Sequence, residues 1–492
     1  MKKDSSTSSY RSILKGTSIF GGVQIFNILI NLVRGKFVAV ILGPEGMGIS
    51  SLFMSVSNTI RNFASLGLNQ AIVRETAASS SDSESNSRVI HTVRILTNLT
   101  ALIGLLVCMV FCIPLSRLTF GSEQYAWQFV LLGAAVGFFI AGNAKLAVLQ
   151  GLHEVKRISK ASIVGGLTGL FVGVPLYYIF GDKGIVPAIV ALSLSLYIFY
   201  SVNLHRCNPA SPSSGFSWKE NKETIKKLIF LGAVLMASDL IGSTVTYVLN
   251  LFIRTQGSLD DVGLYQAANS VTNQYAGLVF AAMAMDYYPR LSKVSHDNSA
   301  MCEVVNRQTE IVSLLIAPAM CALIISAPLV IRVLLSDSFL DIIPLMRWMG
   351  LGILIKALSF PMGYIAFAKG NRKVFFILEG LTGNLLYLIL GCLGFYFFGL
   401  IGIGYALVAE NFISIVIYYF VNRRLYDYNF TFGSFNYLLV ATILGILCFG
   451  SSLMESTALS YTFMGIVTGG AVVWALVSLR AKLNRDATGS PS

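Results

Sequence analysis

The stretch QYAWQFVLLGAAVGFFIAGNAKLAVL, residues 124–149, decides the class of fold. It carries one charged side chain, Lys145, and it is long enough to cross a bilayer as a helix, which takes about 20 apolar residues. Similar runs precede and follow it almost without interruption, and only 12% of all residues are charged, against about 25% in soluble proteins. We therefore expect an all-α polytopic membrane protein with its helices packed in the lipid bilayer.

Clusters of charge and of Gly, Pro, Asn and Asp residues divide the apolar sequence into about 14 expected spans. They are 13–42, 46–73, 88–113, 124–149, 158–180 and 184–204, then 225–253, 260–286, 303–334, 341–368, 372–398 and 401–421, and last 433–450 and 457–479. The expected parts are a tail 1–12, a lobe 13–204 of six helices, a loop 205–224, a lobe 225–421 of six helices, two further helices within 433–479 and a tail 480–492.

Two short segments suggest that the two lobes are copies of one unit. GISSLFMSVSN at 48–58 and GLYQAANSVTN at 263–273 share Gly, Ser, Val and Asn at one constant offset, and each falls in the second span of its set. Six helices per copy give both copies the same orientation, so the pattern predicts a parallel repeat, an arrangement that transporters use. The alternative is that the two segments are unrelated amphipathic helices.

The net charge of +12 is explained mostly by membrane orientation. Loops on the cytoplasmic side of a bilayer are enriched in Lys and Arg, and here the basic clusters recur in alternate loops. Examples are Lys156, Arg157 and Lys160, then Lys369, Arg372 and Lys373, then Arg423 and Arg424. The other loops are short and neutral or acidic, so both termini and the loop 205–224 are predicted to be cytoplasmic, and the cations call for no nucleic acid.

Polar side chains recur at helical spacing on four of the spans. They are Gln24, Asn27, Asn31 and Arg34 on the first span, Asn58, Arg61, Asn62, Ser65 and Asn69 on the second, Asp239, Ser243, Thr246, Asn250 and Arg254 on the seventh, and Gln266, Asn269 and Asn273 on the eighth. Steps of three and four residues place each set on one helical face. The pattern predicts a hydrated cavity lined by these four spans.

Cations outnumber acids at depth in the predicted spans. Arg61 and Lys356 lie deepest, whereas Asp239 and Glu410 are the clearest buried acids. A charged side chain near the bilayer centre costs about 2.5–3.5 kcal/mol, so each needs a partner, water or a function. An excess of cations favours an anionic ligand, and phosphate or pyrophosphate suits the guanidinium fork. The simpler interpretation pairs Arg61 with Asp239 and Lys356 with Glu410 and lets the other cations reach an interface.

Motifs for other chemistry are missing from the sequence. No GxxxxGK[ST] loop, HExxH or GxSxG motif occurs, and the seven cysteines form no CxxC pair. We therefore expect no catalytic residues, no metal site and no cofactor. A membrane-embedded glycan polymerase or ligase, the alternative from another class, would be expected to carry a large outer loop.

Five short segments of the sequence carry a family resemblance. They are GKFVAVILGPEGMG at 35–48, DDVGLYQ at 260–266, YPRLS at 288–292, LLSDSF at 334–339 and AFAK at 366–369. The first is similar to the first outer turn of polysaccharide transporters, and together the segments resemble the bacterial O-antigen and enterobacterial-common-antigen flippases of the Wzx type. These flippases belong to the multidrug/oligosaccharidyl-lipid/polysaccharide exporter superfamily.

The resemblance implies two six-helix lobes plus two C-terminal helices in the bacterial inner membrane, and movement of an undecaprenyl-pyrophosphate-linked oligosaccharide to the periplasmic leaflet by alternating access. It further implies a polysaccharide polymerase and a chain-length regulator as partners. By span position the cationic cavity residues of the family correspond to Arg34, Arg61, Arg254 and Lys356. The buried acids themselves, and not the resemblance, suggest Asp239, paired with a cavity Arg, or Glu410 as a proton-coupling acid. A peptidoglycan-precursor flippase and a multidrug exporter of the same superfamily remain alternatives.

Overall fold

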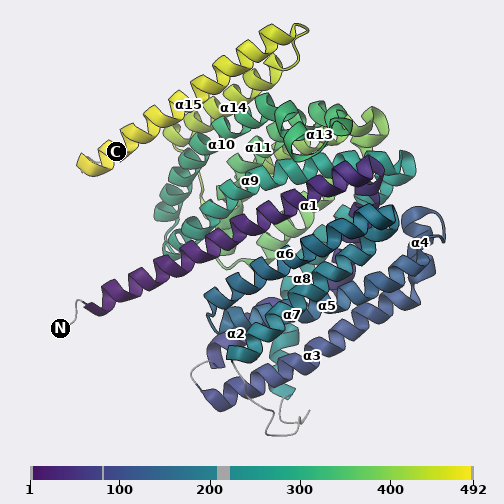
Figure 1. The fold of residues 1–492 in the computed structure, drawn as a ribbon. Coiled ribbons are helices and arrows are strands. Elements are labelled where there is room, and N and C mark those ends of the chain that lie inside the picture. The colour runs from purple at the N-terminus through teal and green to yellow at the C-terminus, as the bar shows by residue number, and fades with distance from the viewer. Residues whose placement is uncertain (1–3, 80–81, 208–221, 489–492) are drawn as a thin grey trace. The chain divides into compact units, whose positions relative to one another are not determined.

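The computed structural model describes residues 4–79, 82–207 and 222–488, and all regular structure within these ranges is helical (Figure 1). This confirms the all-α class. The chain divides into two compact units, Met1–Arg254 and Thr255–Ser492. The lobe boundaries expected from the sequence stay predictions; in the structure the expected seventh span, 225–253, belongs to the first unit.

The first unit consists of eight α-helices and a short 3₁₀ turn in its described residues. They are α1 (Asp4–Ala64), α2 (Leu68–Ser79), α3 (Ser83–Val110), α4 (Cys112–Phe120), α5 (Ala126–Gly151), α6 (Val155–Phe180), η1 (Gly181–Gly184), α7 (Ile185–Cys207) and α8 (Lys222–Gln256). Gly43 interrupts α1 with φ 67°, a conformation that only glycine adopts at little cost, and Pro44 follows it. The kink separates the two spans that the sequence predicts on either side of it.

The second unit contains the remaining helices of the described chain. They are α9 (Leu259–Lys293), α10 (Asn298–Leu334), η2 (Asp337–Ile342), α11 (Ile343–Ala368), α12 (Arg372–Phe375), the π-helical turn η3 (Phe376–Thr382), α13 (Gly383–Tyr426), α14 (Phe432–Ser451) and α15 (Thr457–Thr488). Ser258 and Asp261 form a capping box at the start of α9. Gly399, with φ 62°, breaks α13 in the same way that Gly43 breaks α1.

Nine segments of the described residues are long and apolar enough to cross a membrane. Two of them, 155–207 and 372–426, each contain two of the expected spans joined at a kink or short turn, and 26–64 overlaps the first two expected spans on either side of the kink at Gly43. The helices α8 and α9 coincide with the expected seventh and eighth spans but are not among the nine. The multi-pass membrane class is therefore confirmed, whereas the total of 14 spans stays a prediction.

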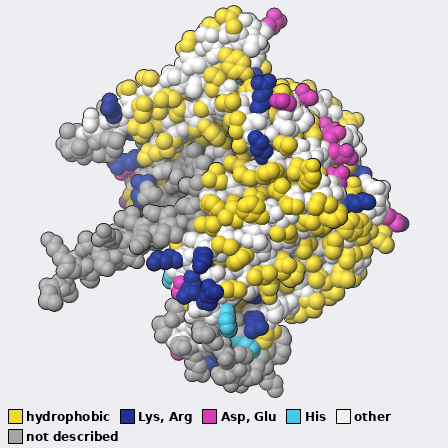
Figure 2. All heavy atoms as spheres, viewed as in Figure 1, with side chains coloured by type: hydrophobic (Ala, Val, Ile, Leu, Met, Phe, Trp, Pro, Cys, Tyr) yellow, Lys and Arg dark blue, Asp and Glu magenta, His cyan; other side chains and the backbone are white. Residues whose placement is uncertain are grey.

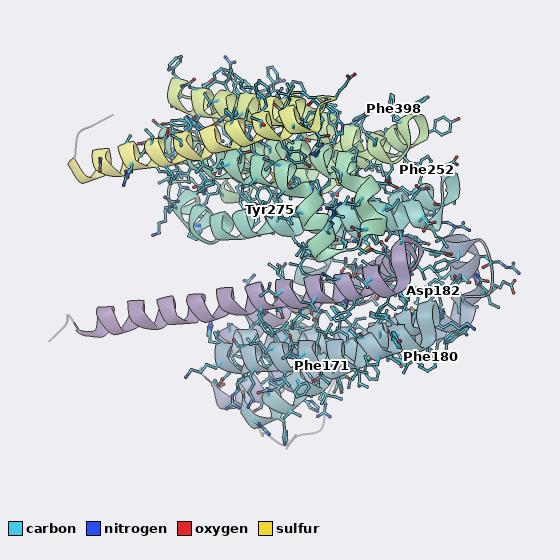
Figure 3. All side chains as sticks on the ribbon, turned by 45° about the horizontal axis from the view of Figure 1, so that its top comes forward. Phe171, Phe180, Asp182, Phe252, Tyr275 and Phe398 are labelled. Carbon is cyan, nitrogen blue, oxygen red and sulfur yellow. The ribbon has the colours of Figure 1, made fainter. Side chains whose placement is uncertain are left out.

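The outer surface of the helices is strongly apolar. Hydrophobic side chains form a broad area across the face in Figure 2, where one group of Lys, Arg and His side chains lies in the lower part near the ends of α2 and α6 and other Lys and Arg side chains lie higher. On α6 the side chains of Phe171 and Phe180 are 73% and 56% exposed, and Phe398 on α13 is 64% exposed (Figure 3). Exposure of so many large apolar side chains is costly in water and is typical of a surface that faces lipid.

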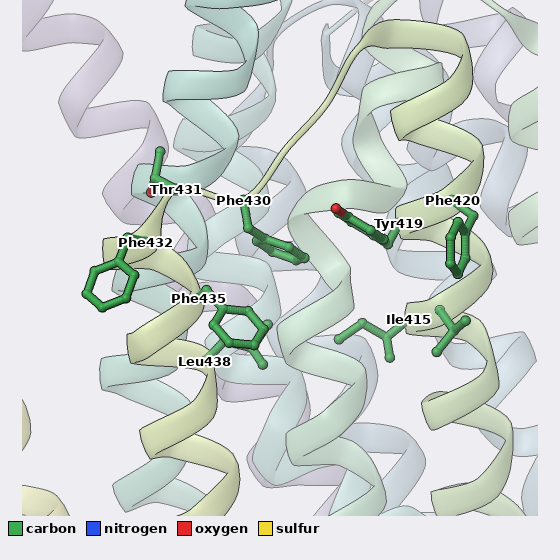
Figure 4. A pocket seen from close by; sticks show the side chains of 9 residues that line it. Ile415, Tyr419, Phe420, Phe430, Thr431, Phe432, Phe435 and Leu438 are labelled. Atoms are coloured by element: carbon green, nitrogen blue, oxygen red, sulfur yellow. The ribbon is translucent and has the colours of Figure 1, made fainter.

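An apolar groove runs between α13 and α14 in the second unit (Figure 4). Its volume is about 590 Å³, and Ile415, Tyr419 and Phe420 of α13 face Phe435 and Leu438 of α14 across it. Apart from the tyrosine and one threonine, its lining carries no polar side chain. The groove suits hydrocarbon and offers nothing that would orient a sugar or a phosphate.

Candidate functional site

A polar seam joins the second half of α1 to α8 in the first unit. Asn250 of α8 donates from Nδ2 to Ser55 Oγ over 2.8 Å, and Thr59 Oγ1 donates to the backbone carbonyl of Ser243 over 3.3 Å. One turn further along α1, Asn62 Nδ2 donates to the carbonyl of Asp239 over 3.2 Å. Residue numbers rise on α1 as they fall on α8, so the two helices run antiparallel with their predicted polar faces in contact.

The seam opens into a pocket of about 360 Å³. It is lined by Ser55, Asn58, Asn62, Asp239, Gly242, Ser243 and Thr246. Every lining residue is polar or glycine, although both helices lie in a chain whose surface is dominated by apolar side chains. A pocket of this composition is stable only when water or a polar ligand satisfies its hydrogen-bonding groups. The structure thus brings together five residues predicted from the sequence to line a cavity, Asn58, Asn62, Asp239, Ser243 and Thr246.

Arg61 borders this pocket through Asn58. Its Nη2 donates to Asn58 Oδ1, and its guanidinium carbon lies 3.6 Å from the centroid of the Phe139 ring on α5. Its Nε is buried and has no hydrogen-bond partner in the described part of the chain. The contacts of Arg61 therefore differ from the simpler interpretation that paired it with Asp239. The guanidinium is held between an amide and an aromatic face, and its charge is not neutralised by a described acid.

Asn250 is completely buried between α1 and α8. It donates to Ser51 and Ser55, and its Oδ1 has no partner among the described residues. An asparagine with both donors used and fully removed from solvent acts as an interhelical hydrogen bond. Its position next to the pocket makes it a support for Ser55, and the structure gives it no exposed surface for ligand contact.

Arg254 contacts a different part of the first unit. Its Nη2 donates to the carbonyl of Phe120, the last residue of α4, and packs on Gly121, which has φ 73°. A cation on the free carbonyls of a helix C-terminus is favourable because of the helix dipole. Arg254 is absent from the lining of the polar pocket, so its described contacts hold the α4–α5 turn.

The first half of α1 carries the remaining predicted residues of this unit. Asn27 and Arg34 are half-buried and Asn31 is exposed, and Arg34 interacts electrostatically with Tyr177 of α6. None of the three lines the pocket of α1 and α8. The side chain of Gln24 lies outside the described residues.

The predicted residues of the second unit are held by local contacts. Glu410 of α13 is 8% exposed, accepts a hydrogen bond from Ser414 Oγ over 2.9 Å and interacts electrostatically with Lys356, which is exposed on α11. No direct ion pair joins Lys356 and Glu410 in the structure as described. Lys356 of α11 and Glu410 of α13 thus attract each other electrostatically but do not form the expected direct ion pair.

On α9, Asn273 Nδ2 donates to Asn269 Oδ1 over 2.6 Å, one helical turn apart, as expected for residues on one face. Asn269 and Gln266 are half-buried and Asn273 is exposed. The sequence thus predicted correctly that the three share one side of the helix, while their role in binding stays a prediction.

Three contributors were missed from the sequence. Ser55 and Gly242 line the pocket, and Phe139 holds Arg61. The spacing of Ser51, Ser55, Asn58 and Asn62 would have extended the polar face of α1 by two turns. Gly242 sits beside Asp239 on the same helix face, where a small residue leaves room. No sequence signal singles out Phe139 among the 32 phenylalanines.

The amino-acid sequence matches one family over most of its length. The family is described as "Polysaccharide biosynthesis protein", and the match covers residues 37–344, which include the second half of α1, the polar pocket and the start of α11.

Two curated relatives and one solved structure are similar to the chain. The Lipid III flippase of Escherichia coli (strain K12) is 24% identical over 75% of this chain and 88% of the relative. The Succinoglycan biosynthesis transport protein ExoT of Rhizobium meliloti (strain 1021) is 22% identical over 73% of this chain and 68% of the relative. The Lipid II flippase MurJ in its inward closed conformation has a TM-score of 0.71 at 15% identity, covering 95% of this chain and 99% of that one, so the two share a fold.

Proposed function

Because the chain belongs to the polysaccharide biosynthesis protein family, we propose that it moves an undecaprenyl-pyrophosphate-linked oligosaccharide from the cytoplasmic to the periplasmic leaflet by alternating access. The oligosaccharide is the repeat unit of O-antigen or a related surface polysaccharide. At the coarser level the protein is a multi-pass membrane transporter of the multidrug/oligosaccharidyl-lipid/polysaccharide exporter superfamily, and its relatives are flippases and transport proteins rather than enzymes.

The observation that carries the proposal is the polar pocket beside Arg61. A pocket of about 360 Å³ with only polar and glycine lining fits part of a sugar, whose hydroxyl groups donate and accept hydrogen bonds. Asn58 and Asn62 each offer both a donor and an acceptor. Arg61 supplies a positive charge at its edge, where a pyrophosphate oxygen can accept from the guanidinium. The lipid tail stays in the bilayer, against the apolar outer surface of the helices.

The remaining predicted cavity residues stay in the proposal on the sequence pattern. They are Gln24, Asn27, Asn31, Arg34, Asn250, Arg254, Gln266, Asn269, Asn273 and Lys356. In the structure Asn250 and Arg254 hold helices and turns, which makes them supports of the site in the first unit. The polysaccharide polymerase and chain-length regulator implied by the resemblance stay proposed partners.

Ion coupling is proposed at Asp239 and Glu410. Asp239 is exposed and lines the pocket, so it can exchange a proton with water and change the charge beside the substrate. Glu410 is buried and accepts a hydrogen bond from Ser414. Because burial of an ionisable group inside a membrane costs free energy, such a group is usually present for a function. In vesicles with an imposed pH gradient, Asp239→Asn or Glu410→Gln should make transport insensitive to that gradient. Full sensitivity in both variants would remove these acids from the mechanism.

The second candidate function is transport of the peptidoglycan precursor. The shared fold with a protein described as the Lipid II flippase MurJ, over 95% of this chain, favours it. A multidrug exporter, also of this superfamily, is less favoured because its cargo would need acidic binding residues, and the pocket lining has one acid, Asp239, beside an asparagine, Asn58, that accepts from Arg61.

Deletion of the gene separates these candidates. We expect loss of surface polysaccharide and accumulation of its lipid-linked repeat unit, with normal peptidoglycan and normal drug susceptibility, and restoration by the wild-type chain. Growth arrest that is relieved by a known peptidoglycan-precursor flippase would assign the second candidate instead. Unchanged surface polysaccharide together with raised drug susceptibility would overturn the proposal in favour of an exporter.

A further inference from the structure

A second polar cavity lies in the first unit and shares no residue with the pocket of α1 and α8. Its volume is about 320 Å³, and its lining comes from α3, α5 and α7. The side chains that matter to the argument are Arg94 and Asn98 of α3, Lys145 of α5, and Tyr197, Ser201 and His205 of α7. The rest of the wall is apolar except for Thr97. Ala141 and Ala144 are small, and their size makes room for the cavity.

This basic cavity, as we call it, collects positive charge without a counter-ion. Lys145 and Arg94 are close enough to act on each other electrostatically, and no Asp or Glu lines the space. Within the described residues neither Lys145 nor Arg94 forms an ion pair. The ammonium of Lys145 lies 4.4 Å from the centroid of the Tyr197 ring, which holds it in place without neutralising it.

Two cations beside an apolar wall repel each other, and the low dielectric of the wall strengthens the repulsion. An anion bound between the two cations would attract both of them, so that attraction would outweigh the repulsion. The neighbouring Asn98 amide and Tyr197 hydroxyl are donors that can complete the coordination of an oxyanion. Ser201 uses its own hydroxyl locally, donating to the carbonyl of Tyr197 over 2.6 Å. The chemistry of the lining therefore fits an oxyanion such as a phosphate group.

We propose that the basic cavity of α3, α5 and α7 binds a phosphate group presented from the cytoplasmic side, separately from the polar pocket of α1 and α8. The charge pattern of the sequence predicts the cytoplasmic side for this end of the helices, and basic pockets between membrane helices on that side accept phospholipid headgroups. The phosphate can belong to an anionic phospholipid of the inner leaflet or to a soluble anion. The site does not depend on which glycan is transported, because its ligand is the phosphate alone.

Binding to the purified full-length protein tests the proposal without any glycan substrate. One arm measures thermal stability in nanodiscs of phosphatidylcholine with increasing phosphatidylglycerol, and the other titrates inorganic phosphate and pyrophosphate in neutral nanodiscs. Lys145→Met and Arg94→Gln remove one charge each. Each Lys or Arg near a membrane surface contributes to the free energy of anion binding. Loss of one of these cations should therefore weaken anion binding roughly fivefold, and loss of both should weaken it about 25-fold.

Two variants control for indirect effects. Lys145→Arg keeps the charge and should bind like the wild type, which separates loss of charge from misfolding. Arg117→Gln removes a cation that is 67% exposed and paired with Glu123, and it should leave anion binding unchanged. Stabilisation by phosphatidylglycerol alone assigns the site to a lipid headgroup, and stabilisation by free pyrophosphate assigns it to a soluble anion. Equal responses of the wild type and the double variant in both arms would overturn the proposal, whatever the outcome of the deletion experiment.

Discussion

Arg61 is the residue on which the proposed binding of pyrophosphate depends most. It is the one predicted cavity cation that both borders the polar pocket and has a buried polar atom, Nε, with no partner in the described chain. The sequence singled it out because a cation in an apolar run is conspicuous, whereas its depth in the membrane stays a prediction. Its partners could not be predicted, because Phe139 comes from another helix and aromatic residues are common throughout the chain.

Replacement of Arg61 should reduce glycan export without reducing the amount of protein in the membrane. Arg61→Ala removes a charge-assisted hydrogen bond, which is worth about 1.5–3 kcal/mol, so surface polysaccharide should fall at least about tenfold. Arg61→Lys keeps the charge but lacks the planar guanidinium fork, so the amount of surface polysaccharide should lie between those of the wild type and Arg61→Ala. Surface polysaccharide is measured by immunoblot beside the membrane level of each variant, with the exposed, ion-paired Arg117→Ala as control. Normal display by Arg61→Ala would show that the guanidinium plays no part in binding.

Among helices, the contact of α1 with α8 could be predicted in part. Steps of three and four residues place Asn58 and Asn62 on the polar face of α1 and Asp239 on the polar face of α8. Polar faces of helices in a membrane protein pack together or face water. Which faces meet depends on tertiary packing that periodicity does not contain. The same limit applies to Arg254: its position at the end of a span was correct, but its partner, the α4 terminus, lies more than a hundred residues away.

Gly121 should be intolerant of any side chain. It has φ 73°, and a Cβ there would meet the guanidinium of Arg254. The left-handed conformation alone costs roughly 1–2 kcal/mol for other residues, so Gly121→Ala should lower the midpoint of thermal unfolding. Gly469 lies inside α15 with open space around it and provides the matched control, Gly469→Ala, which should not lower the midpoint. Equal midpoints for the two variants would contradict the conclusion that this turn requires glycine.

For the whole chain, orientation in the membrane rests on the distribution of Lys and Arg. In the second unit Lys482 near the end of α15 contacts Glu310 in the first half of α10, so these two segments share one end of that unit. The loop after α14 lies at the far end of the same helix α15. The positive-inside pattern predicts that the end with Lys482 is cytoplasmic.

Labelling of single cysteines with a membrane-impermeant maleimide tests this orientation. In a variant with the seven native cysteines replaced, Ser456→Cys and Ala481→Cys place one thiol at each end of α15, both at exposed positions. Ser456→Cys should react in intact spheroplasts, and Ala481→Cys only after the membrane is permeabilised. The opposite pattern would invert the predicted topology and place the basic cavity on the periplasmic side.

Transport in proteoliposomes tests the central claim most directly. The purified chain is reconstituted with a fluorescent undecaprenyl-pyrophosphate oligosaccharide, and the fraction accessible to a membrane-impermeant quencher is followed with time. We predict rapid exchange between leaflets with the wild type, and a rate at least about tenfold lower for Arg61→Ala and for the double variant Asn58→Ala/Asn62→Ala. A wild-type rate equal to that of protein-free liposomes, or full activity of both variants, would contradict the claim that this pocket carries the lipid-linked glycan.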